Sequence, residues 1–137
     1  SDVYKRQTLA HELGHYLGLR HVFSEGGTTS MCTDTDYCKD TPSYNRSEYE
    51  QWLNNLDKQN KYQLKDLAKR YSCEKGEYEA HNIMDYAYCF YNEITLEQRK
   101  RIRHILNYSP LIPGPKESRI DTRGVQGRLN LPICIMK

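Results

Sequence analysis

The stretch HELGHYLGLRH at residues 11–21 decides how the rest of this chain is interpreted. It holds three of the five histidines, His11, His15 and His21, and a glutamate, Glu12, directly after the first of them. On a helix, residues four apart lie on one face, so His11 and His15 can direct their imidazoles at one ion. Glu12 points aside from that pair and can reach a metal-bound water without binding the metal. The spacing therefore predicts a metal site with its own base.

A third ligand at His21 cannot come from the same straight helix, because the ion would lie too far along the axis. We expect the helix to end near Gly18, since glycine enters the left-handed conformation at least cost, and His21 to return from the following loop. Three neutral imidazoles leave the fourth position of a tetrahedral zinc ion open for water, which is the catalytic pattern. A coincidental pair of histidines is the alternative, and the glutamate, the glycine and the third histidine together argue against it.

Length and composition set broad limits on the fold and on the partners. The 137 residues have room for one modest domain, and 37% hydrophobic with 28% charged residues is a globular composition. Twelve tyrosines against two phenylalanines and one tryptophan predict a half-polar core that a disulfide or a metal would help to hold. No basic run with interleaved aromatic residues indicates a nucleic-acid partner, and no apolar stretch is long enough for a transmembrane segment.

The first seven residues are expected to be foreign to the rest of the chain. The letters DVYKRQ at 2–7 are what one reading frame of a sequencing-transposon end encodes, so we expect residues 1–7 to be a non-native artefact. Only residues 8–10 then precede His11. We therefore expect native sequence, including any signal peptide, to be missing upstream.

The cysteines lack the paired CxxC spacing of a structural zinc ribbon. Disulfides are the favoured use, and they imply an oxidising, extracytoplasmic setting. Buried free thiols in a cytosolic chain are the alternative. We expect Cys134, the odd cysteine near the end, to be unpaired. The other four are Cys32, Cys38, Cys73 and Cys89.

The segment from Val22 to Asn45 is rich in Gly, Ser, Thr, Asp and Pro, and it predicts a long ordered loop. Loops of this length are uncommon unless they are functional or cross-linked. Within it, Asp36, Asp40 and Thr41 offer hard oxygen ligands, so a calcium site is one interpretation of this cluster. The spacing is not that of an EF-hand, and turn formation is the alternative.

Two apolar patterns of helical spacing follow, which predict two short amphipathic helices separated near residues 54–60. Ser47 is the expected N-cap of the first helix. Packing surface is the favoured role of the aromatic stripe, and a substrate cleft is the alternative. The residues are Tyr49, Trp52, Leu53 and Leu56 in the first pattern and Leu64, Leu67, Ala68 and Tyr71 in the second.

A third helix is predicted from Thr95, which forms a capping box with Gln98, to about Asn107. Beyond it the chain is punctuated by proline and glycine, with at most a short strand at 131–136. The apolar face of the helix has Ile102, Ile105 and Leu106. The basic face, predicted to be solvated, has Arg99, Lys100, Arg101, Arg103 and His104.

The turn HNIMDY at residues 81–86 is the second chemical constellation. Taken alone, Met84 would be a core filler. Downstream of the histidine motif, it is the expected Met-turn, which forms a hydrophobic floor beneath three zinc-binding imidazoles.

The motifs HELGHYLGLRH, DYCKDTP at 36–42 and HNIMDY resemble, in that order, the metzincin clan of zinc endopeptidases and within it the pappalysin-like family. The resemblance covers roughly residues 8–112 and leaves 113–137 as a Pro/Gly-rich extension. It implies zinc bound by the three histidines, Glu12 as general base and then general acid, and Met84 as the Met-turn residue. The sequence SPLIPGP at 109–115 is similar to the bacterial cell-envelope lipoprotein branch of the family.

The resemblance implies further features with less direct support from the residues themselves. Tyr86 would lie near the metal and hydrogen-bond an oxyanion, and calcium would bind near Asp36 to Thr41. Crossed disulfides would join Cys32 to Cys73 and Cys38 to Cys89. The expected fold is mainly α with long irregular loops, the lower, C-terminal subdomain of a metzincin α+β catalytic domain. The upper sheet, whose edge strand binds the peptide substrate, would be missing.

The predicted function is that of a zinc-dependent metalloendopeptidase that acts on protein or peptide substrates. A zinc-activated water would attack the peptide bond with Glu12 as general base. The expected location is extracytoplasmic, either secreted or in the bacterial cell envelope, with room for a lipid anchor upstream. One alternative is a non-catalytic, zinc-bearing extracellular binding module, although such a site needs no base at Glu12. Another is a fragment that is inactive without its missing N-terminal half.

Overall fold

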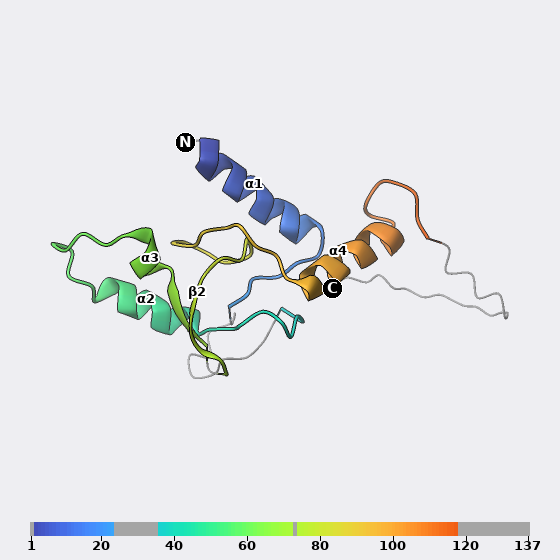
Figure 1. Cartoon of the computed structure of the whole chain (residues 1–137). Helices are drawn as coiled ribbons and strands as arrows, with labels where there is room; N and C mark the ends of the chain where they lie inside the picture. The colour runs from blue at the N-terminus through green and yellow to red at the C-terminus, as the bar shows by residue number, and fades with distance from the viewer. Residues whose placement is uncertain (1, 24–35, 73, 118–137) are drawn as a thin grey trace.

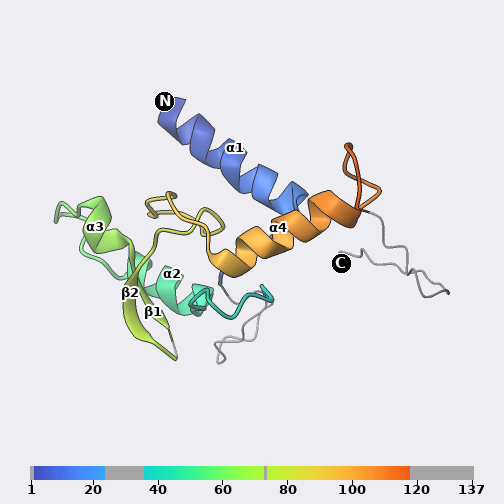
Figure 2. The ribbon, with the colours of Figure 1, turned by 45° about the vertical axis from the view of Figure 1, so that its right-hand side comes forward.

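The computed structural model describes residues 2–23, 36–72 and 74–117, and all elements named below belong to that part of the chain. The segment 80–95 separates two parts of the fold, with α1 and α4 on one side of it (Figure 1, Figure 2). The other side has α2, α3 and a β-hairpin. In chain order the elements are α1 (Asp2–Tyr16), α2 (Arg46–Asn54), α3 (Leu64–Leu67), β1 (Lys69–Ser72), β2 (Gly76–Glu79) and α4 (Leu96–Tyr108).

Helix α1 ends in a left-handed glycine turn. Gly18 has φ +88°, and its N–H donates to the carbonyl of His15 at 2.9 Å. The N–H of Leu19 reaches back to the carbonyl of Gly14, also at 2.9 Å. These two bonds satisfy carbonyls that the end of the helix leaves open. The predicted end near Gly18 is confirmed.

Helix α4 begins with the predicted capping box. The N–H of Gln98 donates to the hydroxyl of Thr95 at 3.2 Å, and the Gln98 side-chain oxygen accepts from the Thr95 N–H at 2.9 Å. Ile105 is buried, and Ile102 packs against the cluster around Met84. The prediction of this helix is confirmed, with an end one residue later than expected.

The prediction that Arg101 lies on a solvated face of α4 is wrong. Its Nε donates to the carbonyl of Gly18 at 2.6 Å, and its guanidinium lies over the Tyr37 ring. The carbonyls at the end of α1 attract a cation, which explains why this arginine turns inward. The rest of the basic face is exposed as expected: Arg99, Lys100, Arg103 and His104.

The N-cap of α2 is Asn45, so the prediction of Ser47 is wrong. The Asn45 side chain accepts from the N–H of Glu48 at 3.2 Å, which places Ser47 inside the first turn. The aromatic stripe of α2 is only partly packing surface, since Tyr49 is buried and Trp52 is 41% exposed. Both line a cavity of about 330 Å³ next to β1.

The second predicted amphipathic helix is wrong beyond Leu67. The chain changes there into the antiparallel hairpin of β1 and β2, in which Lys69 pairs with Glu79. Burial alternates along β1, with Arg70 and Ser72 inside and Tyr71 72% exposed. Long-range contacts of Arg70 therefore override the local helical periodicity.

Three small clusters replace a single large core among the described residues, and the interior is half-polar, as the tyrosine-rich composition predicts. Buried polar side chains include Arg70, Asp85 and Gln98. None of the described helices is long and apolar enough to cross a membrane. The clusters centre on Leu19, Val22 and Met84, on Phe23, Tyr44 and Tyr49, and on Ala68, Ala80 and Cys89. The expected strand at 131–136 lies outside the described residues.

A candidate metal centre

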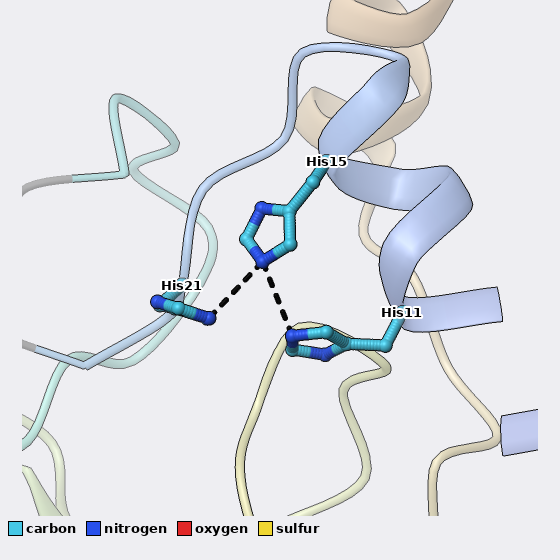
Figure 3. A group of neighbouring side chains, drawn as sticks. All are labelled: His11, His15 and His21. Carbon is cyan, nitrogen blue, oxygen red and sulfur yellow. Dashed lines mark hydrogen bonds between the residues drawn. The ribbon is translucent and has the colours of Figure 1, made fainter. Parts of the chain in front are cut away.

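The three histidines of the 11–21 motif converge as the sequence predicts. His11 and His15 project from one face of α1, and the turn at Gly18 brings His21 back beside them (Figure 3). The Nε2 atom of His15 lies 3.1 Å from Nε2 of His11 and 3.1 Å from Nε2 of His21. Nitrogen ligands of a tetrahedral zinc ion at about 2.0–2.1 Å lie about 3.3–3.4 Å apart. The spacing of the imidazoles therefore fits such an ion.

The outer nitrogens of two imidazoles fix their tautomers. Nδ1 of His11 lies 2.8 Å from the carbonyl oxygen of Ile83, and Nδ1 of His15 lies 3.0 Å from that of Leu19. A carbonyl only accepts, so each Nδ1 has the proton and each neutral ring has its lone pair on Nε2. Those two lone pairs face one another at 3.1 Å. They repel unless a cation lies between them, so the donor set itself fits a metal ion.

The environment of His11 favours the neutral ring that metal binding requires. The residue is 6% exposed, and burial lowers its pKa below the ordinary value. The hydrogen bond to the Ile83 carbonyl acts in the opposite direction, whereas His15 and His21 lower the pKa further. Because a neutral imidazole is the ligand form, His11 is prepared to bind a metal near neutral pH.

The turn at 81–86 supports the site from below α1. Asn82 Oδ1 accepts from the N–H of Met84 and from Nε2 of Gln98, both at 3.0 Å, so helix α4 fixes the turn. The turn supplies the Ile83 carbonyl to His11, and Met84 is fully buried against Leu19. The role of Met84 as a floor under the imidazoles stays a prediction.

Tyr86 and Glu12 share a cavity with His11, the first histidine of the triad. The ring centroid of Tyr86 lies 5.3 Å from that of His11 and 4.5 Å from that of His21. Tyr86 is 44% exposed, and Glu12 is exposed as well. A cavity of about 420 Å³ is lined by His11, Glu12 and Tyr86, together with Tyr4, Gln7, Thr8, Asp85, Ala87 and Tyr91. A carboxylate and a phenol therefore open onto the same space as a ligand imidazole.

Comparison with known sequences identifies the family. The model of the family described as pregnancy-associated plasma protein-A, the pappalysin peptidases, matches residues 1–107. The chain belongs to the pappalysin peptidase family. The matched region includes the histidine motif, the Met-turn and most of α4.

Curated relatives of this pappalysin chain are named as extracellular metalloproteases. The proteins of that name from Arthroderma benhamiae and Trichophyton verrucosum are each 37% identical over 99 residues, which are 70% of this chain and 30% of each relative. The protein of that name from Arthroderma otae matches to the same extent. The chain thus spans about a third of the length of the curated relatives it matches. No solved structure matches.

The acidic cluster at 36–41 of this pappalysin chain forms a turn. Asp36 accepts from the N–H of Cys38 at 2.9 Å and from the hydroxyl of Thr41. Asp40 and Glu97 exchange two hydrogen bonds of 2.8 and 3.0 Å at the start of α4. These carboxylates are used as turn and cap acceptors, which supports the turn-forming alternative. Nothing in the described residues supports calcium at Asp36, Asp40 and Thr41.

Cys38 and Cys89 are free thiols in this structure, which does not support the disulfide expected between them. Cys38 belongs to the turn next to α4, whereas Cys89 packs with Ala68 and Ala80 and contacts the carbonyl of Asn82 at 3.2 Å. Burial raises the pKa of both thiols to about 12, which keeps them protonated. The other expected partners, Cys32 and Cys73, lie outside the described residues.

Several residues around the triad are not marked by any motif in the sequence. Phe23 stacks on His21, with ring centroids 4.7 Å apart and an interplanar angle of 13°. Arg46 and Arg70 both donate to the carbonyl of Tyr86. Phe23 lies two residues after His21, and this closeness in the sequence is the one signal that could have placed it near the triad. No local pattern marks the two arginines, which reach the site only through the fold.

Proposed function

We propose that this chain provides the catalytic zinc site of a metalloendopeptidase that cleaves peptide bonds. The observation that supports the proposal is the convergence of three imidazole nitrogens, one of which belongs to His11 and so lies beside the cavity that Glu12 and Tyr86 also line. Membership in a peptidase family agrees with it. His11, His15 and His21 would hold the ion, because three neutral imidazoles are a zinc donor set that leaves one position open.

When bound, zinc supplies a Lewis acid that acidifies a water molecule and polarises a carbonyl. Glu12 would take the proton from the attacking water and later deliver it to the leaving amine. Its carboxylate is exposed and lines the same cavity as the His11 imidazole, so it is available as a base in that space. The Tyr86 hydroxyl donates a hydrogen bond to the oxyanion that develops on the carbonyl.

Two backbone carbonyls determine the ring orientation and the tautomer of two of the proposed ligands. The carbonyl of Ile83 orients His11 and the carbonyl of Leu19 orients His15, in each case by accepting from Nδ1. Such outer partners fix the tautomer and raise the basicity of the ligand nitrogen. The Met-turn and the glycine turn therefore each hold one ligand of the proposed site.

The fold that we propose for this chain is the lower subdomain of a metzincin catalytic domain. Helix α1 buries only His11 and Gly14, whereas Leu9, Leu13 and Tyr16 on its other side are 50–68% exposed. An apolar face of this kind normally packs against another layer. These exposed residues support the proposal that an upper layer covers α1 in the whole protein.

The proposed substrates are proteins or peptides, and the proposed location is extracytoplasmic. The names of the curated relatives support this location for the whole protein. A zinc-bearing binding module is the second candidate function. It would have the same triad without peptide-bond cleavage, so it is distinguished by the role of Glu12.

The test is to measure bound zinc and cleavage of quenched fluorescent peptide pools by the full-length protein, with and without chelator. Glu12→Gln is expected to bind zinc and to lose at least about 100-fold in kcat/KM, because a general base contributes on the order of 10²–10⁴-fold. Glu77→Gln, an exposed glutamate on β2, is the matched control and is expected to leave activity unchanged. Zinc-loaded protein that cleaves no peptide, or an active Glu12→Gln variant, contradicts the peptidase proposal.

A further inference from the structure

The loop that follows Tyr86 has an uncommon backbone conformation. Ala87 and Tyr88 both have positive φ, at +46° and +39°. Residues other than glycine enter this region at a cost, so surrounding contacts must hold them there. The loop also bears Tyr86 at its start, beside His11 and His21. Whatever holds the loop therefore places the phenol next to the metal centre.

One guanidinium nitrogen holds three consecutive carbonyls of this loop. Nη2 of Arg70 lies 3.2 Å from the carbonyl oxygen of Tyr86, 2.9 Å from that of Ala87 and 3.3 Å from that of Tyr88. The left-handed residues bend the chain so that these oxygens converge. The Arg70 cation thus stabilises a loop conformation that Ala87 and Tyr88 would not adopt by preference.

Arg70 is fully enclosed, and a carboxylate and an aromatic ring lie beside its charge. The side chain is 0% exposed, Asp85 Oδ2 lies 3.5 Å from its Nε, and the guanidinium lies 3.9 Å from the centroid of the Tyr49 ring. Asp85 in turn accepts from the hydroxyl of Tyr44 and, at 2.7 Å, from the N–H of Tyr86. The buried ion pair is therefore bonded to the residue beside the triad through both of its members.

Arg46 contacts Tyr86 from the other side. Its Nη1 donates to the Tyr86 carbonyl at 3.3 Å, and its guanidinium lies 5.6 Å from the centroid of the Tyr86 ring. Arg46 is the first residue of α2, where a cation opposes the helix dipole. Arg46 also pairs with Glu50 one turn later in α2, at 3.0 Å, so the same guanidinium contacts both its own helix and Tyr86.

We propose that Arg46 and Arg70 are positioning residues that together hold Tyr86 beside the histidine triad, so that its hydroxyl is directed at the reacting carbonyl. The inference rests on the proposed peptidase function. Arg70 fixes the loop through its backbone, and Arg46 fixes both the Tyr86 carbonyl and the face of its ring. Neither arginine is required to touch substrate or metal.

The first test does not depend on activity. Hydrogen exchange is followed in the metal-free full-length protein, in peptides that cover 85–91 and 11–21. Arg46→Gln is expected to speed exchange in 85–91 by at least about threefold and to leave 11–21 unchanged, because a local contact is lost without global opening. Arg103→Gln, exposed on α4, is the matched control. Unchanged exchange in 85–91, or equal acceleration throughout the chain, overturns the proposal.

The second test uses the zinc-loaded protein and separates positioning from mere structure. Arg46→Gln is expected to lower kcat by about 10–100-fold, as misplacement of a catalytic group does, with KM nearly unchanged. Arg46→Lys, which keeps the charge and a donor, should recover part of kcat. In a Tyr86→Phe background Arg46→Gln should have almost no further effect, and additive losses contradict the proposal. A protein without any peptidase activity refutes the proposed function, and the exchange experiment then still decides whether the arginines hold the loop.

Discussion

A β-carbon added to Gly14 would lie 2.4 Å from the sulfur atom of Met84, closer than any real contact of this kind. Gly14 is buried in α1 directly before His15, the second histidine of the triad, and Met84 is 0% exposed. The helix therefore approaches the Met-turn so closely that only a hydrogen fits. This contact joins two motifs that are 70 positions apart in the sequence, and it determines how closely α1 packs on the turn at 81–86.

Gly14→Ala should destabilise the protein although alanine is the better helix former. The change gains about 1 kcal/mol of helix propensity but overpacks the contact with Met84 at a cost of about 1–3 kcal/mol. We expect a net loss of up to about 2 kcal/mol in the free energy of unfolding, measured by urea denaturation. In a double-mutant cycle with Met84→Ala, the combined loss should be smaller than the sum of the single losses, and strict additivity contradicts the contact.

The convergence of the three histidines was predictable because most of it is local. The residues of the 11–21 motif lie within eleven positions, and a glycine that ends a helix brings His21 back without help from the rest of the chain. The capping box of Thr95 and Gln98 is local for the same reason. Short-range geometry of this kind follows from helix periodicity and turn chemistry.

The supports of the site were not predictable, since they depend on distant parts of the chain. Arg70 fits the helical pattern of its neighbours, but a buried partner, Asp85, draws it into a strand. Arg101 turns toward a carbonyl 83 positions earlier, and Cys38 and Cys89 pack into different regions. Local patterns do not indicate which of several partners the fold will supply.

Removal of one ligand should abolish zinc binding without unfolding the chain. His21 comes from the loop after α1, so His21→Gln leaves the helix intact while it removes a third of the donor set. We expect about one zinc per chain in the parent and almost none in the variant, measured by atomic absorption after dialysis. Zinc at 100 times its dissociation constant should stabilise the parent by about 2.7 kcal/mol and the variant by much less. His104→Gln, on the exposed face of α4, is the control and should keep both properties.

Loss of the buried cation should be far more costly than loss of a surface ion pair. Arg70→Met leaves the Asp85 carboxylate uncompensated in the interior, so we expect a loss of about 3–5 kcal/mol in the free energy of unfolding. Glu50→Gln removes the exposed partner of Arg46, 3.0 Å away, and should cost less than about 1 kcal/mol. Both are measured by urea denaturation. Asp85→Asn in the Arg70→Met background should recover part of the loss, and a double variant no more stable than Arg70→Met contradicts the role of the pair.

His81 should make a small part of the stability depend on pH. Its Nδ1 lies 2.9 Å from Asn92 Oδ1 and its Nε2 lies 2.7 Å from Glu79 Oε1, so both nitrogens face acceptors. Burial lowers the pKa of His81, but the bonds to Asn92 and Glu79 and the charges of Glu79 and Glu93 prevail and raise it above the ordinary value of 6.5.

A raised pKa in the folded state means that this stabilisation is fully present below about pH 6.5 and is lost as pH rises through the higher folded value. Because the His81 side chain is 32% exposed, the effect should be below about 1 kcal/mol. The measurement is the difference in unfolding free energy between the parent and His81→Gln, at steps from about pH 5.5 to about pH 8.5. We expect the difference to shrink toward alkaline pH. A difference that grows with pH would mean that the neutral ring, and not the imidazolium, makes the stabilising contacts.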